Sequence, residues 1–424
     1  DCAMNTFNKI SVVGLGYIGL PTAAVFANHG VQIVGTDTSQ SVVDSINAGK
    51  PHFGEPDLDA LVRRVVENGK LSASTEVQAA DAFLVAVPTP LRAGKDAGQE
   101  ADLGADLNYV KAAAEAIAPV LVKGNLVILE STSPVGTTEK MAEWMAALRP
   151  DLSFPHDAGE MADINVAHCP ERVLPGRIIE EVVNNPRVIG GMTRKCAQRA
   201  VSLYRIVVRG ECKVTNARTA EMSKLVENAY RDVNIAFANE LSVICDGHDI
   251  NVWELIQMAN LHPRVDILSP GPGVGGHCIA VDPWFIVEGA PEDAKIIRMA
   301  RQINDAMPGI VCAKVVARAQ ALVDPVVACL GLSYKADVDD LRESPAVEIV
   351  AQLAALNIAE LLVVEPHIST LPGELADRGL ELTDFDKAMA RANMVLLLVD
   401  HSAFMHVDRD LIKDKFVIDT RGAW

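Results

Sequence analysis

Short apolar runs alternate with longer helical patterns through the first part of the chain. The stretch 9–37 predicts a strand, a tight glycine turn, a helix and a second strand, and further apolar runs follow at 82–90 and 125–132. Helical patterns lie near 106–118 and 136–147, whereas the polar stretch 91–107 predicts a mobile loop. This alternation is typical of a parallel, doubly wound sheet with helices between its strands.

The pattern changes in the centre of the chain and then returns. Residues 219–262 predict long helices, and the last third contains a strand that ends near Leu332 and buried runs in "ELLVVEP", "MVLLLVD" and "KFVIDTRG". We therefore predict an α/β protein with two doubly wound parallel-sheet domains joined by a central segment of long helices. The expected domains are 5–205, 206–315 and 316–424, and the long apolar helix after Thr219 suggests a homodimer through the central segment.

Composition narrows the classes of function. The 424 residues are 49% hydrophobic and 22% charged, which is enough apolar material for real cores. The formal charge of −18 argues against extended binding to nucleic acid or to an anionic membrane, so an anionic ligand would need a local basic pocket. No run approaches the roughly 20 apolar residues of a membrane span. The eight scattered cysteines form no CxxC or zinc spacing, and we expect reduced thiols, no metal and a cytoplasmic location.

The glycine turn carries a dinucleotide-binding pattern. Gly14, Gly16 and Gly19 give G-x-G-x-x-G between a strand and a helix, and Asp37 ends the second strand. The glycines let the backbone reach a pyrophosphate at the helix N-terminus, and the Asp37 carboxylate favours the ribose of NAD over the 2′-phosphate of NADP. Thr89 and Thr132 close two strands at the ligand-binding edge. The alternatives are a glycine turn that binds nothing and threonines that merely end strands.

A second glycine-rich stretch, "GPGVGGHCIAVDP" (271–283), surrounds a cysteine with bare backbone. A cysteine that serves packing usually lies among apolar neighbours in a strand or helix. Cys278 instead follows four glycines and precedes Asp282 by four residues, in backbone that can approach a ligand closely. Cys278 is therefore the candidate nucleophile.

The order of motifs resembles the nucleotide-sugar 6-dehydrogenases, the family of UDP-glucose and GDP-mannose dehydrogenases. The resemblance covers essentially the whole chain through "GLGYIGLP", "VPTP", "ESTSPVGTTE", "PERVLPG", "EMSKLVENAYRDVNIAFANE", "GPGVGGHCIAVDP", "SYKADVDDLRESPA" and "DTRG". It implies two Rossmann-like domains and a four-electron oxidation of a sugar C6 alcohol to a carboxylate with two NAD⁺. A thiolate makes the second oxidation possible because it holds the aldehyde as a thiohemiacetal, which is oxidised to a thioester and hydrolysed.

The resemblance also implies roles for individual residues. Cys278 is the nucleophile, Lys224 and Asn228 stabilise the developing oxyanion, Asp282 holds a water, and Glu171 serves hydrolysis or proton relay. The division of labour among Lys224, Glu171 and Asp282 stays open. Lys224, Asn228 and Arg231 share one helix face at i, i+4 and i+7, which by itself could be a solvated face, and Glu171 could simply pair with Arg172.

Further positions in matching motifs imply two binding sets. The expected NAD contacts are Gly14, Gly16, Tyr17, Ile18, Gly19, Asp37, Thr89, Thr132 and Arg342. The expected contacts with the UDP-sugar are Arg172, Val173, Lys224, Asn228, Arg231, His262, Arg264, Gly275, Tyr334, Lys335 and Arg421, in which arginine and lysine suit the diphosphate.

The finer substrate assignment rests on a few motifs. "HPRVDILSPGPGVGGHCIAVDPWFIV" and "CPERVLPGR" are most similar to the branch of the family that oxidises UDP-N-acetyl-D-mannosamine for bacterial surface polysaccharide (lipopolysaccharide) precursors, with UDP-N-acetylglucosamine or UDP-glucose as alternatives. The family often has phenylalanine and serine in the cysteine loop, where this chain has Val274 and His277.

Three other interpretations of the sequence compete. Cys278 and His277 could form a dyad, although adjacent side chains on extended backbone point apart. A two-electron 3-hydroxyacid dehydrogenase has a similar first domain but no use for Cys278 or a second α/β domain. A non-catalytic nucleotide-sugar or NAD sensor would not need a nucleophile.

Overall fold

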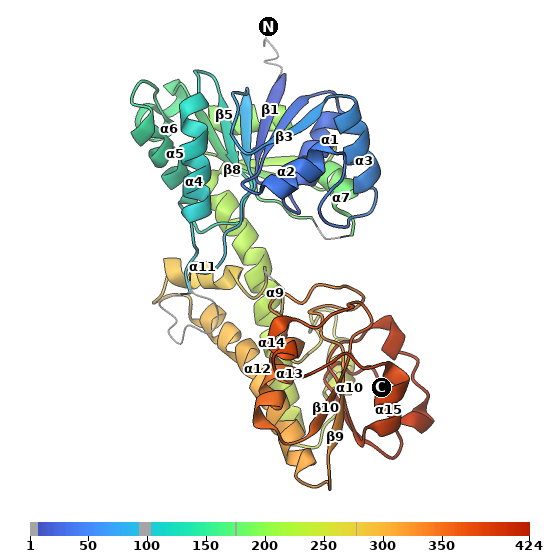
Figure 1. The fold of residues 1–424 in the computed structure, drawn as a ribbon. Coiled ribbons are helices and arrows are strands. Elements are labelled where there is room, and N and C mark those ends of the chain that lie inside the picture. The colour runs from blue at the N-terminus through green and yellow to red at the C-terminus, as the bar shows by residue number, and fades with distance from the viewer. Residues whose placement is uncertain (1–6, 93–102, 174–175, 277) are drawn as a thin grey trace. The chain divides into compact units, whose positions relative to one another are not determined.

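The N-terminal unit is built on the alternation of strand and helix that the sequence predicts. The computed structural model describes residues 7–92, 103–173, 176–276 and 278–424, which divide into two units at Val226. In the described part of the first unit, one sheet has the strand order β3-β2-β1-β4-β5-β6-β7-β8 (Figure 1). Its strands are β1 (Lys9–Val13), β2 (Gln32–Thr36), β3 (Leu71–Ser74), β4 (Ala82–Val85), β5 (Leu126–Leu129), β6 (Asn165–His168), β7 (Arg187–Gly191) and β8 (Cys212–Asn216).

Helices cover both faces of this sheet. They are α1 (Gly19–Asn28), α2 (Gln40–Asn47), α3 (Leu58–Glu67), α4 (Asn108–Ile117), α5 (Thr137–Leu148), α6 (Pro155–Ala158), α7 (Ile178–Asn184) and α8 (Arg194–Tyr204). Successive strand residues point to opposite faces, so Val12 packs in the core beneath α1, α3, α7 and α8, whereas Val13 packs in the core beneath α4 and α5. The doubly wound arrangement is confirmed.

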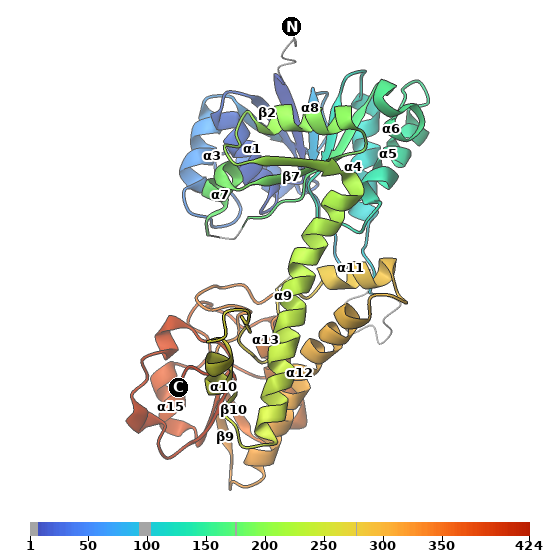
Figure 2. The same ribbon diagram turned by 180° about the vertical axis from the view of Figure 1, so that it is seen from behind.

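The first sheet is not parallel throughout, contrary to the sequence-based expectation. The strands from β3 to β6 in the sheet order run parallel. Strand β7, labelled in Figure 2, pairs antiparallel with β6 through Ala167–Gly191 and His168–Gly190, and β8 runs parallel to β7. Hydrophobic alternation reports burial and carries no information on strand direction, which is why the pattern missed this reversal. The predicted loop 91–107 lies largely outside the described residues.

The second unit contains a smaller, fully parallel sheet and the long helices. Its strand order is β10-β9-β11-β12, from β9 (Val326–Leu330), β10 (Glu360–Val364), β11 (Met394–Leu397) and β12 (Phe416–Asp419). The helices are α10 (Val252–Ala259), α11 (Asp282–Gly289), α12 (Lys295–Ala319), α13 (Pro345–Leu356), α14 (Gly373–Ala376) and α15 (Phe385–Arg391). Helix α9 (Ala217–Asp246) begins in the first unit and continues into the second.

Both sheets have a topological switch point, where ligands of such folds bind. The strand order reverses between β1 and β4 in the first sheet and between β9 and β11 in the second. In the second unit, α12 and α13 cover one face through Val315 and Val350, and α15 covers the other through Met389. Within the described residues, no helix combines the length and apolar character needed to cross a membrane.

Candidate active site

The glycine turn between β1 and α1 is packed so that two of its glycines cannot carry a side chain. A Cβ on Gly14, whose φ is +92°, would lie 2.5 Å from the carbonyl oxygen of Ala86. A Cβ on Gly19 would lie 1.8 Å from the carbonyl oxygen of Gly14, whereas one on Gly16 would meet no atom within 4 Å. Gly16 therefore borders open space at the start of α1, which fits the approach of a pyrophosphate.

Asp37 follows β2 and braces this turn. Its Oδ2 accepts a 3.1 Å hydrogen bond from the backbone amide of Leu15, and its Oδ1 accepts one of 2.9 Å from the amide of Ser39. The side chain is half-buried at the carboxyl end of the strand. A carboxylate held there can still accept from the hydroxyls of a ribose, so the residues present fit NAD.

The other predicted NAD contacts of this unit lie around the same edge. The Thr89 hydroxyl, which follows β4, donates a 2.5 Å hydrogen bond to the carbonyl oxygen of Thr132, which follows the neighbouring strand β5. Tyr17 is exposed, and its ring centroid lies 4.3 Å from that of Phe53. Ile18 is half-buried directly before α1. The structure thus joins the two threonines that the sequence could place only at separate strand ends.

Glu221, which the sequence analysis did not single out, caps the N-terminus of α5. Its carboxylate accepts hydrogen bonds from the amides of Gly136 and Thr138 at 2.7 and 2.8 Å and from the Thr138 hydroxyl at 2.6 Å. The side chain is 1% exposed, and burial raises the pKa of this carboxyl despite the three donors. A carboxylate at a helix N-terminus satisfies amides that have no partner within the helix.

Glu171 is buried in an ion pair rather than paired with its neighbour. Its Oε2 accepts a 2.5 Å hydrogen bond from Nη1 of Arg187 on β7, and its Oε1 accepts one of 2.6 Å from the backbone amide of Arg172. The Arg187 side chain is 3% exposed. The Arg172 and Val173 side chains are half-buried next to Glu171 in the chain. The alternative that Glu171 pairs with the side chain of Arg172 is therefore wrong in its partner, because the ion pair joins Glu171 to a residue sixteen positions away.

A second carboxyl lies in the same buried cluster. The Tyr204 hydroxyl donates a 2.6 Å hydrogen bond to Oε1 of Glu130, and Oε2 of Glu130 has no hydrogen-bond partner among the described residues. Burial raises the pKa of Glu130 to about 7, with the Arg187 cation opposing that shift and the Glu171 charge adding to it. Arg187 therefore pairs with Glu171, and Glu130 is the carboxyl of the cluster that is still partly protonated at neutral pH.

Helix α9 carries the predicted polar stripe. Lys224 is half-buried, Asn228 is 6% exposed, and Arg231 is exposed. The Asn228 amide donates a 2.5 Å hydrogen bond to Oδ2 of Asp282, the first residue of α11, which is itself 3% exposed. Asn228 is therefore no part of a solvated face, because it binds one of the predicted catalytic carboxylates.

The glycine-rich loop that leads to Cys278 packs tightly against the segment after β9. A Cβ on Gly275 would lie 2.7 Å from Cβ of Tyr334, and one on Gly276, whose φ is +82°, would lie 3.1 Å from the Tyr334 ring. The carbonyl oxygen of Cys278 then accepts the backbone amide of Asp282 at 2.9 Å. Close packing on an aromatic ring explains why these loop positions are glycines.

Cys278 differs from most other cysteines in exposure. Of the seven described cysteines, Cys278 and Cys212 are half-buried and the other five are buried. Burial raises the pKa of Cys169 and Cys329 to about 12 and that of Cys312 to about 11, and it also raises the pKa of Cys212. Raised thiol pKa values leave little nucleophilic thiolate at neutral pH. His277, the partner in the competing dyad, lies outside the described residues.

The predicted cations of the second unit follow the strand ends and the loop after α10. Nε of Arg421 donates to Asp400 at 2.9 Å, and a Cβ on Gly271 would lie 2.8 Å from Nη1 of Arg421, so this guanidinium lies against the start of the glycine-rich loop. Lys335 is exposed. Arg342 donates to both carboxylate oxygens of Asp340. His262 and Arg264 are exposed and joined by a 3.2 Å hydrogen bond from the Arg264 amide to Nδ1 of His262.

Comparison with known proteins decides the family. Three sequence signatures match in order: the NAD binding domain of the UDP-glucose/GDP-mannose dehydrogenase family over residues 8–208, its central domain over 218–306 and its UDP binding domain over 328–424. The chain belongs to the UDP-glucose/GDP-mannose dehydrogenase family. It is an NAD-dependent nucleotide-sugar dehydrogenase, so the sensor and the 3-hydroxyacid dehydrogenase are set aside.

Two relatives and one solved structure are similar to this chain over nearly its whole length. The chain is 59% identical over 418 residues to the NDP-N-acetyl-D-galactosaminuronic acid dehydrogenase of Ralstonia nicotianae, covering 99% of this chain and 96% of that one. It is 57% identical over 410 residues to the UDP-N-acetyl-D-mannosamine dehydrogenase of Campylobacter jejuni, covering 96% and 99%. Among solved structures it resembles the UDP-D-ManNAc dehydrogenase of Pyrococcus horikoshii with a TM-score of 0.85 and 39% identity, covering 98% and 96%.

Proposed function

We propose that this chain oxidises the C6 hydroxyl of UDP-N-acetyl-D-mannosamine to the carboxylate of UDP-N-acetyl-D-mannosaminuronate, a precursor of bacterial surface polysaccharide. The observation that carries the proposal is the position of Cys278. Cys278 is half-buried at the end of a loop whose glycines pack on Tyr334, and its carbonyl oxygen accepts the backbone amide of Asp282. The Asp282 carboxylate accepts a hydrogen bond from the side-chain amide of Asn228. A reactive cysteine needs such a partly exposed setting beside polar groups.

The thiol is needed for the second of two oxidations. After the alcohol has become an aldehyde, the Cys278 thiolate adds to C6 to give a thiohemiacetal, and loss of a hydride converts this adduct to a thioester. Water then attacks the thioester, which releases the carboxylate and restores the thiol. The glycine turn and Asp37 would hold NAD⁺, which would supply the hydride acceptor, and the two oxidations together would need two equivalents of it.

The remaining catalytic roles follow from hydrogen-bonding capacity. Asn228 has an amide that can donate to an oxyanion, and the Asp282 carboxylate that orients it can also hold a water. We assign to Lys224 the stabilisation of the developing alkoxide, because it precedes Asn228 by one turn of α9. Glu171 serves hydrolysis or proton relay. In the structure, Arg187 donates to one of its oxygens and the Arg172 amide to the other.

The proposed contacts with the two nucleotides form two sets of residues. NAD contacts are assigned to the glycine turn, Asp37 and the threonine pair, together with Arg342. The UDP-sugar contacts are assigned to Tyr334, Lys335, Arg421, Gly275, His262, Arg264, Arg231, Arg172 and Val173. The UDP binding signature over 328–424 supports the role of the second sheet, and its switch point is where an open α/β sheet binds ligands.

The choice of sugar rests on the relatives. The Campylobacter relative and the Pyrococcus structure carry names that specify N-acetylmannosamine, and the cysteine-loop motifs of this chain point the same way. The Ralstonia relative specifies N-acetylgalactosaminuronic acid at slightly higher identity, so oxidation of UDP-N-acetylgalactosamine is the second candidate. Both sugars carry a 2-acetamido group, and a site with buried groups that bind it rejects a plain hydroxyl because those groups would lose their partners.

The test is a kcat/KM panel over UDP-N-acetylmannosamine, UDP-N-acetylgalactosamine, UDP-N-acetylglucosamine, UDP-glucose and GDP-mannose. We expect the first to be the best by tenfold to several hundredfold, since each lost buried hydrogen bond costs about 1–3 kcal/mol. Equal or better turnover of UDP-N-acetylgalactosamine would favour the second candidate. A preference for UDP-glucose would refute the acetamido site.

We propose that the chain forms a homodimer through α9 and works in the cytoplasm. Tyr230, Phe237 and Ile244 follow each other at seven-residue spacing on α9 and are 66%, 51% and 50% exposed. Such an apolar stripe on a long helix is typical of a helix–helix interface. Sedimentation of the wild type against Phe237→Glu, which introduces a charge in that stripe, tests the dimer. A wild-type monomer at micromolar concentration would refute it.

A further inference from the structure

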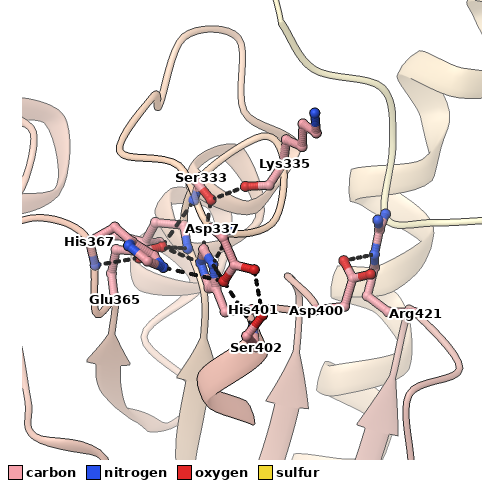
Figure 3. Close-up of polar contacts among 10 residues, drawn as sticks. Ser333, Lys335, Asp337, Glu365, His367, Asp400, His401, Ser402 and Arg421 are labelled. Atoms are coloured by element: carbon pink, nitrogen blue, oxygen red, sulfur yellow. Dashed lines mark hydrogen bonds and ion pairs between the residues drawn. The ribbon is translucent and has the colours of Figure 1, made fainter. Parts of the chain in front are cut away.

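Two consecutive residues after β11 contact two separate parts of the proposed substrate site. Asp400 and His401 lie at the carboxyl end of the second sheet, beside the switch point between β9 and β11. Figure 3 shows Asp400 directed to Arg421 and His401 directed to the segment that carries Lys335. The reaction as proposed above assigns no role to either Asp400 or His401.

His401 is fully buried and makes directional bonds through both ring nitrogens. Its Nδ1 accepts the backbone amide of Asp337 at 2.9 Å, and its Nε2 lies 3.0 Å from Oε2 of Glu365. Because Nδ1 accepts an N–H, the proton of the neutral ring must lie on Nε2, from which it is donated to Glu365. The ring therefore connects the segment after β9 to the end of β10.

Glu365 fixes the beginning of the same segment. Its Oε2 also accepts the backbone amides of Leu332 and Ser333 at 2.7 and 3.1 Å, and the Ser333 hydroxyl donates to the carbonyl oxygen of Lys335 at 2.6 Å. The backbone is thus held on both sides of Lys335, by Ser333 before it and by the Asp337–His401 bond after it. The Lys335 side chain extends away from this network (Figure 3).

Asp400 holds the second cation. Its Oδ1 accepts Nε of Arg421 at 2.9 Å, and this guanidinium lies against Gly271 at the start of the glycine-rich loop. The side chain of Arg421 is 31% exposed and that of Asp400 is 35% exposed, so the contact is partly open to solvent. Because Asp400 binds Nε, it fixes the orientation of the Arg421 guanidinium and hence the direction of its terminal nitrogens.

A metal ion is the competing explanation for this cluster. Nitrogen and oxygen atoms of Asp337, His367 and His401 lie within 4.8 Å of one another. However, Nδ1 of His401 already accepts an amide, and the Asp337 carboxylate accepts the amide and the hydroxyl of Ser402 at 2.9 and 2.5 Å. A metal would have to displace these bonds, so the geometry favours a hydrogen-bonded scaffold.

We propose that Asp400 and His401 are positioning residues that set the two cations, Arg421 and Lys335, for the diphosphate of the nucleotide sugar. Neither residue needs to touch the substrate. The inference rests on the proposed function through the roles assigned to Lys335 and Arg421. It predicts that loss of either contact weakens binding of UDP and leaves NAD binding unchanged.

The experiment compares five variants of the full chain with one control variant. His401→Gln keeps a donor for Glu365 and loses the acceptor for Asp337, whereas His401→Asn keeps an acceptor and loses the donor. Asp400→Asn removes the charge beside Arg421. Lys335→Ala and Arg421→Ala remove the cations themselves. His406→Gln, at an exposed histidine of the same segment, is the matched control.

The readouts are the Kd of UDP by calorimetry, KM for the nucleotide sugar, KM for NAD and kcat at saturation. We expect all variants except the control to weaken UDP at least fivefold, with KM for NAD and kcat changed less than twofold in the His401 and Asp400 variants. If His401→Gln fails to fold, as judged by circular dichroism, Asp400→Asn and His401→Asn still test whether Asp400 and His401 position the two cations.

Three results would each contradict one part of this proposal: the positioning role, the substrate roles of the two cations, or the absence of a metal from the cluster. Unchanged UDP affinity in the His401 and Asp400 variants, alongside weakened binding in Lys335→Ala and Arg421→Ala, refutes the positioning role alone. Unchanged affinity in the two alanine variants refutes the substrate roles on which the inference rests. A wild-type UDP affinity that falls with a chelator and recovers with Zn²⁺ assigns the cluster to a metal instead.

Discussion

The amide of Asn228 donates a 2.5 Å hydrogen bond to the carboxylate of Asp282, and both side chains are buried. This contact ties α9 to the first residue of α11, whose backbone amide also binds the carbonyl oxygen of Cys278. The Asn228–Asp282 pair therefore links the proposed oxyanion donor to the backbone of the proposed nucleophile. Its charge and its hydrogen bond can be separated by mutation.

Asn228→Asp places two carboxylates at hydrogen-bond distance in a buried site. We expect a loss of stability of about 1.5–3 kcal/mol, the worth of a hydrogen bond to a charged group, together with loss of turnover. The double variant Asn228→Asp/Asp282→Asn restores an amide–carboxylate pair with the charge on the other residue. It should recover the thermal midpoint but not kcat, because the acceptor for a water and the donor for an oxyanion have exchanged places.

Thermal unfolding and steady-state kinetics on the two single variants and the double variant check this prediction. Recovery of both stability and kcat in the double variant would show that only the pair's hydrogen bond matters. Additive loss of stability in the double variant would show that the two side chains do not interact.

Cys278→Ser should lose turnover by orders of magnitude while the affinities for NAD and UDP-sugar stay within a fewfold of wild type. A hydroxyl is a far poorer nucleophile than a thiolate near neutral pH. Iodoacetamide should modify Cys278 fastest, with UDP-sugar slowing the reaction, and peptide mass spectrometry should find the half-buried Cys212 unmodified on the same timescale. Near-normal turnover of the serine variant would refute covalent catalysis.

Product stoichiometry tests the same step without mutation. With limiting nucleotide sugar, we expect two NADH per sugar and no free aldehyde, because the aldehyde is held as a thiohemiacetal until its second oxidation. Absorbance at the NADH band and trapping with a hydrazine reagent measure the two quantities. One NADH per sugar with a trapped aldehyde would falsify the four-electron reaction.

Asp37→Asn should reduce the preference for NAD over NADP about tenfold in kcat/KM. The neutral amide no longer repels a 2′-phosphate, while its oxygen can still accept from Leu15 or Ser39, so the glycine turn keeps most of its bracing. Asp44→Asn on the neighbouring helix α2 is a suitable control, since it removes the same charge outside the turn. An unchanged cofactor ratio in Asp37→Asn would place the ribose elsewhere.

Sequence patterns predicted those features that depend on neighbours in the chain. Gly14, Gly16 and Gly19 predicted the turn before α1, and the apolar runs predicted β9 to β12, because backbone conformation repeats locally. The expected burial of the last strand was wrong, since Phe416 and Val417 of β12 are exposed at the edge of the sheet. The same patterns gave no sign of the direction of β7, which depends on how the connection between β6 and β7 returns to the sheet.

The partners of buried polar groups could not be predicted in this way. Arg187 on β7 pairs with Glu171, which follows β6. Glu221 accepts from the first turn of α5, more than eighty positions earlier in the chain. His401, which follows β11, binds Glu365, which follows β10. Each of these contacts depends on the three-dimensional arrangement of strand ends. A buried polar residue in an apolar run, such as Arg187 at the start of β7, is the one local signal that could have drawn attention to them.

Glu130 provides a pH signature for the buried cluster. Its pKa is raised from the ordinary value of 4.5 to about 7 in the folded chain, chiefly by burial. Below pH 4.5 both folded and unfolded chains carry the proton, so the group has no effect on stability. As the pH rises from 4.5 to 7 the unfolded chain releases the proton while the folded chain keeps it, so stability is lost across this window, by about 3 kcal/mol in all.

Glu130→Gln removes this titration and retains an oxygen that can accept the 2.6 Å hydrogen bond from Tyr204. We therefore expect the thermal midpoint of the variant, measured relative to wild type, to rise between pH 5 and pH 8. Any constant cost of the new amide cancels in that comparison, because it is present at both pH values. Glu67→Gln, at an exposed position that ends α3, should show no such change. If the difference between Glu130→Gln and wild type is the same at both pH values, Glu130 carries its charge in the folded chain, and Arg187 must neutralise both carboxylates rather than Glu171 alone.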